Sequence, residues 1–240
     1  MASQRQKNYM IIFSSNDKDI KLIGEGGNSR IYLLERDYNG FQSAAIKVPK
    51  ALADHRVPKA IDNYNLLKQH GIKTTVFLDE CLFDGVQALI TENLHQEDFT
   101  YLDANSHLQT EKDKLLKSLG AGFGLERSEK EPEEERWFAD NKFELITNFE
   151  GFVENYILFL RAVSDKHIYL AYDCYFFKVK RDKRTDIDYT IADWEDIQIY
   201  EHDDLFEKNK DQFKTALFQF VERFVEEGMA EKYKNYLEQL

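Results

Sequence analysis

The sequence predicts an α+β protein with two lobes: a five-stranded antiparallel sheet with one helix, then a reduced, mainly helical lobe. Short apolar strands separated by glycine and asparagine turns fill most of the first 91 residues. The longest stretches with apolar residues at helical spacing lie after residue 145. A chain of 240 residues is long enough for two such lobes. We place the boundary in a short polar connection, so that the lobes span residues 1–94 and 95–240.

Composition excludes some partners. The net charge of −12, from 44 acidic and 32 basic residues, argues against nucleic acid and acidic membranes as partners, because like charges repel. No stretch is long and apolar enough for a signal peptide or a membrane span. The two cysteines, Cys81 and Cys174, lack metal-ligand spacing, and we expect reduced, buried thiols in a cytoplasmic protein.

A glycine-rich turn joins two predicted strands near the start of the chain. The turn comprises Gly24, Glu25, Gly26, Gly27, Asn28 and Ser29. Backbone N–H groups of such a turn can surround phosphates, because glycine lets the backbone approach closely. Lys47 lies in the apolar strand Ala44-Ala45-Ile46-Lys47-Val48 and can reach the same phosphates as a point charge. The alternatives are an ordinary hairpin turn and a lysine on an exposed strand face.

The remaining elements of the first lobe follow from turn residues and spacing. The expected strands are Ile20–Ile23, Arg30–Glu35, Phe41–Val48, Thr74–Phe83 and Val86–Thr91. Asn39-Gly40 and Asp84-Gly85 are typical hairpin turns. A helix is expected to begin near Pro58 and to stop at Gly71. Residues 9–13 are predicted either to add a strand or to pack as an apolar plug.

The second lobe is predicted around a helix over residues 149–163. Its apolar stripe has helical period, and Thr147 and Glu150 have capping-box spacing. A buried loop and strand follow over 168–179, and a strand over 189–192 ends at Asp193. The last forty residues are expected to be helical, with a break at Gly228. The acidic insertion at 126–136 is either a solvated face or an interaction tail.

The order of these parts resembles the protein-kinase-like superfamily. Gly24-x-Gly26-x-x-Ser29 resembles its glycine-rich loop, Ala44-Ala45-Ile46-Lys47 its strand lysine, and Ile191-Ala192-Asp193-Trp194-Glu195 its metal-binding motif. The resemblance implies ATP and Mg²⁺ as cofactors, with Asp193 on the metal and Asp173 as the catalytic residue. The nucleotide would contact Gly24, Gly26, Gly27, Ser29 and Lys47, and the hinge would contribute Glu92 and Leu94.

This sequence departs from the family pattern at several positions. The helix of the first lobe offers Asp62 or Asn63 where the family has a glutamate. If Asp173 is the catalytic residue, Lys178 stands where the family has a metal-binding asparagine; a register shifted by one gives Tyr172 and Phe177 instead. The sequence therefore leaves two functions open. One is a phosphotransferase that acts on a hydroxyl of a protein or a small molecule, and the other is a pseudokinase that serves as a regulatory or protein-interaction module.

Overall fold

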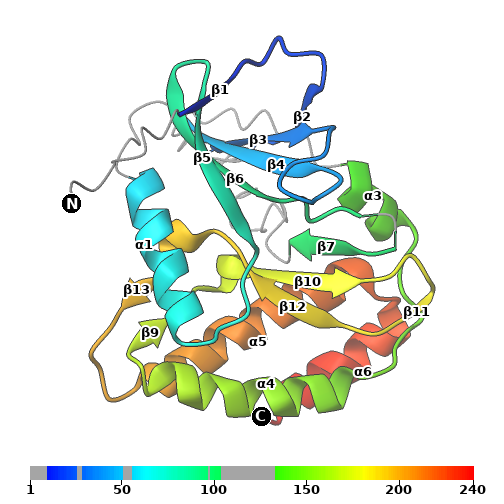
Figure 1. Cartoon of the computed structure of the whole chain (residues 1–240). Helices are drawn as coiled ribbons and strands as arrows, with labels where there is room; N and C mark the ends of the chain where they lie inside the picture. Colours follow the sequence, from blue (N-terminus) through cyan, green and yellow to red (C-terminus); the bar gives the residue numbers. More distant parts are fainter. Residues whose placement is uncertain (1–9, 26–28, 51–55, 97, 104–132) are drawn as a thin grey trace, which may run out of the picture. The chain divides into compact units, whose positions relative to one another are not determined.

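The computed structural model describes residues 10–25, 29–50, 56–96, 98–103 and 133–240 (Figure 1). The chain divides into two compact units, residues 1–57 with 76–93 and residues 58–75 with 94–240. Gly26 and Gly27 of the predicted phosphate loop lie outside the described residues, as does most of the acidic insertion at 126–136. The predicted boundary between residues 94 and 95 stays a prediction.

The first unit contains a six-stranded sheet in the order β1-β5-β6-β4-β3-β2. Its strands are β1 (Ile11–Phe13), β2 (Ile20–Glu25), β3 (Ser29–Leu34), β4 (Ala44–Pro49), β5 (Phe77–Phe83) and β6 (Val86–Glu92). The predicted five-stranded antiparallel sheet is wrong, because β1 adds a sixth strand that pairs with β5 in parallel. Burial of Phe13 explains why residues 11–13 join the sheet, since the pairing of β1 with β5 places the Phe13 ring in the core.

The hairpin turns of this sheet confirm the predictions from Asn-Gly and Asp-Gly. Asn39 and Gly40 have φ values of 49° and 87°, and Asp84 and Gly85 have 47° and 82°. Two successive residues with positive φ form the turn whose twist matches that of antiparallel strands. The first of these turns is closed by hydrogen bonds in both directions between Tyr38 and Phe41.

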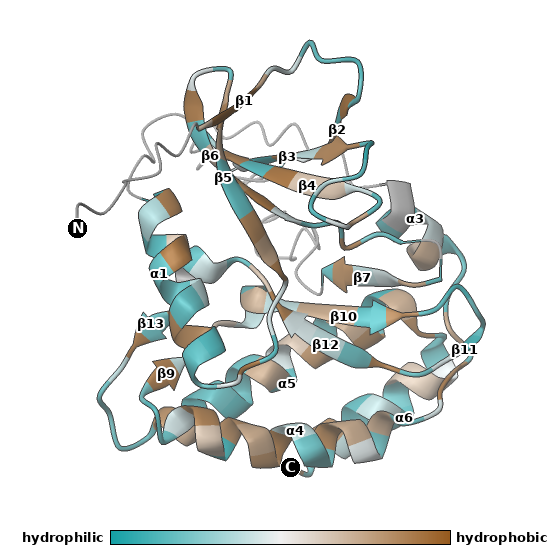
Figure 2. Cartoon of the chain, viewed as in Figure 1, coloured by the Kyte–Doolittle hydropathy of each residue, from teal (hydrophilic) through white to brown (hydrophobic). Residues whose placement is uncertain are grey.

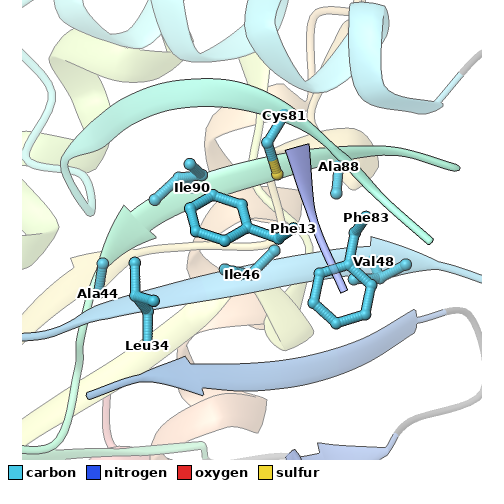
Figure 3. Close-up of a cluster of buried hydrophobic side chains, with 9 residues drawn as sticks. All are labelled: Phe13, Leu34, Ala44, Ile46, Val48, Cys81, Phe83, Ala88 and Ile90. Carbon is cyan, nitrogen blue, oxygen red and sulfur yellow. The ribbon is translucent and has the colours of Figure 1, made fainter. Parts of the chain in front are cut away.

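A cluster of buried side chains forms the core of the first unit (Figure 3). The cluster comprises Phe13, Leu34, Ala44, Ile46, Val48, Cys81, Phe83, Ala88 and Ile90. The members from β4 alternate along the strand, so Ile46 and Val48 point into the core and Lys47 points to the opposite face. Because Cys81 is buried in this cluster, the pKa of its thiol is raised to about 12. The predicted burial of both free cysteines is confirmed.

Helix α1 (Arg56–Gln69) ends where the sequence predicts, at Gly71 with φ 67°. The N–H groups of Gly71 and Ile72 donate to the carbonyls of Lys68 and Leu67, which is the Schellman arrangement. The strand predicted to begin at Thr74 begins instead at Phe77. Thr74 and Thr75 pair with Ile191, more than a hundred residues away in sequence, and local sequence gives no signal of that contact.

The second unit places helices on one face of a three-stranded sheet in the order β12-β10-β7 (Figure 1). The strands are β7 (Thr100–Asp103), β10 (Tyr175–Val179) and β12 (Asp188–Ile191), and the helices are α3 (Glu133–Asp140), α4 (Phe149–Ser164), α5 (Leu205–Phe224) and α6 (Glu227–Glu238). Tyr156 of α4 stacks on Phe213 of α5 at 4.0 Å between ring centroids, and Phe152 contacts Phe177 of β10. Figure 2 shows the alternation of hydrophobic and hydrophilic residues on α4 and α5 that this packing requires.

Shorter elements complete the second unit. The parallel pair is β8 (Leu145–Ile146) with β11 (Arg184–Thr185), and the antiparallel pair is β9 (Ile168–Tyr169) with β13 (Gln198–Ile199). Two 3₁₀ turns, η1 (Tyr172–Cys174) and η2 (Trp194–Asp196), flank the central strands. Among the helices of the described ranges, none combines the length and the apolar character needed to cross a bilayer.

Two predictions about helix ends are wrong. The predicted capping box is not formed: Asn148 is the N-cap residue of α4 and makes no side-chain capping bond, and the Thr147 hydroxyl instead contacts Asp186. The last helical stretch breaks at Val225 rather than at Gly228, which lies inside α6. The break follows from tertiary pairing, because Phe143 forms a bridge to Val225 and bonds the backbone on both sides of it.

A buried ion pair joins α3 to α5. Arg223 Nη2 lies 3.2 Å from Glu135 Oε2, and both side chains are less than a tenth exposed. Removing one partner of such a pair is more destabilising than replacing both by apolar residues, because it leaves a buried charge. The pair therefore fixes how the short helix α3 packs on α5.

Candidate functional site

The strand pair β10–β12 brings onto adjacent segments the two aspartates that the sequence predicts for catalysis and for metal binding. Tyr175 lies opposite Ile191 in this antiparallel pair. Asp173 precedes Tyr175 by two residues and Asp193 follows Ile191 by two, so both lie at the same end of the pair. The Ala192 N–H donates to the Cys174 carbonyl at 2.9 Å, which continues the contact beyond the strands. The structure thus places Asp173 and Asp193 on adjacent segments of the second unit.

Asp193 has a left-handed backbone conformation, with φ 52° and ψ 50°. A residue with a Cβ pays about 1 kcal/mol or more for this conformation. The surrounding contacts must therefore hold it. Aspartate and asparagine enter this region more readily than other residues with a Cβ, and Asn39 and Asp84 adopt it in the hairpin turns of the first unit.

Side chains of α5 hold the segment that leads to Asp173. Asn209 is fully buried: its Oδ1 accepts the Leu170 N–H at 2.9 Å, and its Nδ2 donates to the Ile168 carbonyl at 2.9 Å. Gln212 Oε1 accepts the Tyr172 N–H at 3.0 Å. Burial, and after it the nearby Asp173 carboxylate, raises the pKa of Tyr169. Asn209 is not among the residues predicted from sequence, although it precedes Phe213 of the apolar stripe by four residues and therefore shares its buried helix face.

Lys178 occupies an unusual environment for a strand lysine. Its Nζ lies 3.6 Å above the ring centroid of Phe99 and 5.9 Å from that of Tyr101. Aromatic faces attract cations within about 6 Å. Lys178 also lies opposite Asp188, which pairs with Lys73. The position that the family resemblance assigns to an asparagine thus carries a cation held against aromatic rings.

In the first unit, Gly24, Ile31 and Lys47 lie in one row across three strands. Gly24 pairs with Ile31, and Ile31 pairs with Lys47. Since neighbouring strands are about 4.8 Å apart, the Cα atoms of Gly24 and Lys47 are separated by roughly 10 Å. Ser29 begins β3 opposite Pro49. The described part of the glycine turn and the half-buried Lys47 therefore lie in the same part of the sheet.

Glu25 anchors both strands that follow the glycine turn, a contact that the sequence analysis missed. Its Oε1 lies 2.8 Å from Lys50 Nζ and 3.2 Å from Arg30 Nε. Hydrogen bonds from Lys50 first, and from Arg30 second, hold the pKa of Glu25 below its ordinary value. Arg30 lies across from Glu25 in the β2–β3 ladder, which is a position where opposite charges stabilise a sheet.

The two predicted hinge residues make backbone contacts of their own. The Glu92 N–H donates to the Val76 carbonyl at 2.9 Å, and Glu92 Oε1 accepts the Val76 N–H at 2.8 Å. The Leu94 carbonyl accepts the Tyr101 N–H at 3.0 Å. Glu92 thus fixes the start of β5, a structural task that the sequence analysis did not foresee. Nucleotide contacts by Glu92 and Leu94 stay predictions.

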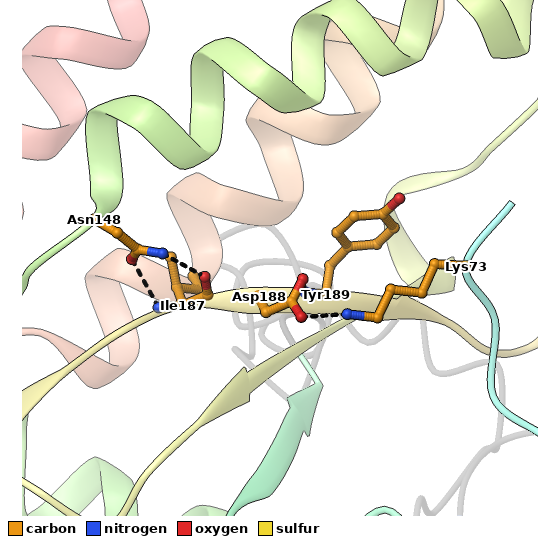
Figure 4. A network of polar contacts seen from close by, with 5 residues as sticks. All are labelled: Lys73, Asn148, Ile187, Asp188 and Tyr189. Carbon is orange, nitrogen blue, oxygen red and sulfur yellow. Dashed lines mark hydrogen bonds and ion pairs between the residues drawn. The ribbon is translucent and has the colours of Figure 1, made fainter.

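The second unit also contains a cavity of about 1100 Å³ beside α4 and the start of β12. Figure 4 shows four residues of its lining, namely Asn148, Ile187, Asp188 and Tyr189. The Asn148 side chain bonds both backbone groups of Ile187, at 2.9 and 2.8 Å, and so mimics a paired strand at the edge of the sheet. Neither Asp173 nor Asp193 lines this cavity. The cavity is therefore separate from the predicted site residues of the second unit.

Comparison with known proteins gives one kind of match. No protein-family model matches this chain, and no curated protein matches it. Among solved structures, the crystal structure of the Helicobacter pylori proinflammatory kinase CtkA is similar to it, with 15% sequence identity and a TM-score of 0.46. The match covers 82% of this chain and 63% of that one, so this chain spans less than two thirds of its length.

Proposed function

We propose that this chain binds ATP with Mg²⁺ and transfers the terminal phosphoryl group to a hydroxyl of a protein or small molecule. The observation that carries the proposal is the placement of Asp173 and Asp193 on adjacent segments at one end of β10–β12. Phosphoryl transfer needs little covalent chemistry from the protein, and it depends on positioning and on charge. In this proposal Asp173 and Asp193, on adjacent segments, would contribute to both.

The proposed metal is a magnesium ion. Mg²⁺ prefers oxygen ligands and usually takes one or two carboxylates together with substrate phosphates. Within the described ranges no group of three or more histidine, cysteine or acidic residues could hold a metal alone. In this proposal Asp193 would supply the carboxylate oxygen, and the nucleotide phosphates would supply further oxygen ligands. When bound, the ion would offset the charge of the phosphates.

The protein residues then have separate tasks. Lys47, with the N–H groups of the glycine turn, would hold the phosphates, since a lysine ammonium binds them as a point charge. Asp173 would accept the proton of the acceptor hydroxyl, which is worth roughly a hundredfold or more in rate. Asp193 would hold the metal-bound phosphates in place.

One observation favours the second candidate function, a nucleotide-binding pseudokinase. Lys178 stands where the resemblance calls for a metal-binding asparagine, and an ammonium group is a donor that cannot ligate Mg²⁺. Its amine instead lies against Phe99. If the reaction needs a second metal ligand at this position, the chain would bind nucleotide without transferring phosphate.

Thermal-shift titrations with ATP, with and without MgCl₂, test binding first. At a hundredfold excess over Kd, binding should raise the Tm by roughly 5 °C or more. Lys47→Ala should lose most of this shift and abolish ATP turnover while leaving the fold intact. Lys21→Ala is the matched control, because Lys21 is exposed on strand β2 of the same sheet. Equal shifts and equal turnover in both variants would reject the proposed role of Lys47.

Substitutions of the two carboxylates separate the two functions. Asp173→Asn should reduce phosphate transfer about a hundredfold and leave binding of ATP with Mg²⁺ unchanged. Asp193→Asn should remove the magnesium dependence of ATP binding. If the unmodified chain binds ATP but transfers no phosphate to water or to itself, the pseudokinase alternative is favoured.

A further inference from the structure

The cavity of about 1100 Å³ in the second unit has an aromatic wall on α4. Phe152 and Phe159 are seven residues apart and therefore lie on one face of this helix, with the exposed Asn155 between them. Both rings are half-buried. The ring centroid of Tyr189, on β12, lies 6.4 Å from that of Phe152 and 5.9 Å from that of Phe159. This wall therefore offers an apolar surface that can receive an apolar side chain.

The backbone of β12 beside the cavity is already hydrogen-bonded within the chain. The Asn148 side chain bonds both backbone groups of Ile187, as Figure 4 shows. The Tyr189 N–H donates to Asp188 Oδ1 at 2.8 Å. Adding a strand to a sheet edge relies on free backbone groups. A partner at this cavity would therefore be recognised through its side chains rather than by adding a strand.

A cluster of cations borders the cavity. The segment 180–184, which joins β10 to β11 and which we call the basic turn, has the sequence Lys-Arg-Asp-Lys-Arg in a chain with a net charge of −12. Lys180 lines the cavity, and Arg184 lies opposite Leu145, another lining residue, in the β8–β11 pair. Both cations are exposed, and neither forms an ion pair with any residue that the structure describes. The basic turn is thus a locally positive region on an acidic protein.

The acidic residues that line the cavity have favourable partners within the chain. Asp186 accepts a hydrogen bond from the Thr147 hydroxyl, and Asp188 pairs with Lys73. Glu150 lies in the first turn of α4, where the helix dipole stabilises a negative charge. These acids are therefore compensated, whereas Lys180 and Arg184 are left to attract an anionic group from outside.

We propose that the cavity and the basic turn together form a docking surface for an acidic peptide segment of a partner protein. The segment would carry one aromatic or large aliphatic residue, which would pack between Phe152 and Phe159. Its carboxylates would pair with Lys180 and Arg184. Charge complementarity selects this occupant, because the basic turn attracts an acidic segment and repels a basic one. None of the predicted site residues lines the cavity, so the inference does not rest on the proposed function.

Fluorescence anisotropy tests the docking surface directly. The probe is a short, fluorescein-labelled peptide of glutamates with one central phenylalanine, and a peptide with alanine at the centre is its control. Lys180→Glu and Arg184→Glu reverse the charge of the basic turn. Lys166→Glu makes the same charge change at an exposed position that does not line the cavity.

A second pair of variants tests the apolar wall. Asn155→Trp places a bulky ring between Phe152 and Phe159, and it should fold normally because Asn155 is exposed. Leu158→Trp is the matched control, since Leu158 is 66% exposed on the same helix and does not line the cavity. Circular dichroism of each variant checks that the fold is retained.

We expect each charge reversal in the basic turn to weaken binding of the phenylalanine peptide about fivefold or more. Asn155→Trp, and replacement of the central phenylalanine by alanine, should each weaken binding at least about tenfold, because an anchor residue in a pocket contributes much of the affinity. Lys166→Glu and Leu158→Trp should stay within about twofold of the unmodified chain. Raising the salt concentration to about 0.5 M should weaken binding, because salt screens the exposed charges.

Three results would overturn the inference. The first is that the unmodified chain does not bind the phenylalanine peptide. The second is that Lys166→Glu weakens binding as much as the reversals in the basic turn, which would indicate unspecific attraction. The third is that a peptide of residues 126–136 of this chain binds more tightly than the probe and responds to the same variants. The occupant would then be the chain's own acidic insertion rather than a partner protein.

Discussion

The glycine turn of the first unit and the carboxylate segments of the second are positioned by different kinds of interaction. In the first unit, strand pairing aligns Gly24, Ile31 and Lys47 in one row. In the second unit, buried or half-buried asparagine side chains bind the backbone of distant segments. Asn63 bonds residues 131 and 134 positions away, and Asn209 bonds residues 39 and 41 positions away.

This difference explains why the arrangement around the glycine turn is easier to infer from sequence than the arrangement around Asp173 and Asp193. A hairpin turn sets the register at which two strands start to pair, and most of the alignment follows from it; a shift between Leu22 and Gly24 then adjusts the β2–β3 pairing. An asparagine amide carries a donor and an acceptor like a peptide group, and it can replace a strand partner wherever the fold places it. Asn148 does so at the edge of β12, where it bonds both backbone groups of Ile187. Its partner cannot be read from neighbouring residues.

The largest expected effect concerns the core of the first unit. Phe83→Ala should lower the free energy of unfolding by about 4 kcal/mol, because it empties a buried site and removes a ring 4.3 Å from that of Tyr32. Urea unfolding measures the loss. Leu22→Ala on β2 is the control, and it should cost less than about 1 kcal/mol, because Leu22 is 43% exposed. A loss for Phe83→Ala no larger than that of the control would mean that this core does not stabilise the sheet.

A smaller loss of stability is expected when the buried side chain of Asn209 in the second unit is removed. Asn209→Ala should cost about 3 kcal/mol, since it leaves the Leu170 N–H and the Ile168 carbonyl buried without their partner. Asn65→Ala, on the exposed face of α1, should stay within about 0.5 kcal/mol of the unmodified chain. Hydrogen exchange should show faster exchange of the Leu170 amide in Asn209→Ala alone. Unchanged protection of that amide would contradict the proposed anchoring.

The smallest effect on stability is expected from removing the charge of Asp84, which lies in a hairpin turn of the first unit. Hydrogen bonds from Ser15 and Ser14 hold the pKa of Asp84 below its ordinary value. Because the folded-state pKa is lowered, the carboxylate stabilises the fold above the unfolded pKa of about 3.9 and loses this effect as the pH falls through the folded value. Asp84→Asn keeps a residue that tolerates the positive φ but removes the charge.

Stability measured from pH 7 to pH 2 checks this expectation. The difference between the unmodified chain and Asp84→Asn should be constant above about pH 5 and should shrink at lower pH. A difference that does not depend on pH would show that the serine contacts do not distinguish the charged carboxylate from the amide.

Much of the fold could be predicted because its signals are local. Alternating strands, the Asn39-Gly40 and Asp84-Gly85 turns and the helix stop at Gly71 all depend on residues close in sequence. The errors arose where distant segments meet. The pairing of β1 with β5, the late start of β5 and the helix break at Val225 each depend on a partner far along the chain.

The candidate site divides in the same way. The sequence alone singled out Lys47, Asp173 and Asp193 by residue type and order. It also noted Asp62 or Asn63 at the position where the family has a glutamate. The tertiary structure decided that Asn63 binds the carbonyls of Trp194 and Ile197 and that Asn209 holds the segment before Asp173. The physical reason is that a residue's chemistry and preferred turns are encoded locally, whereas a hydrogen bond across 131 positions exists only once the chain has folded.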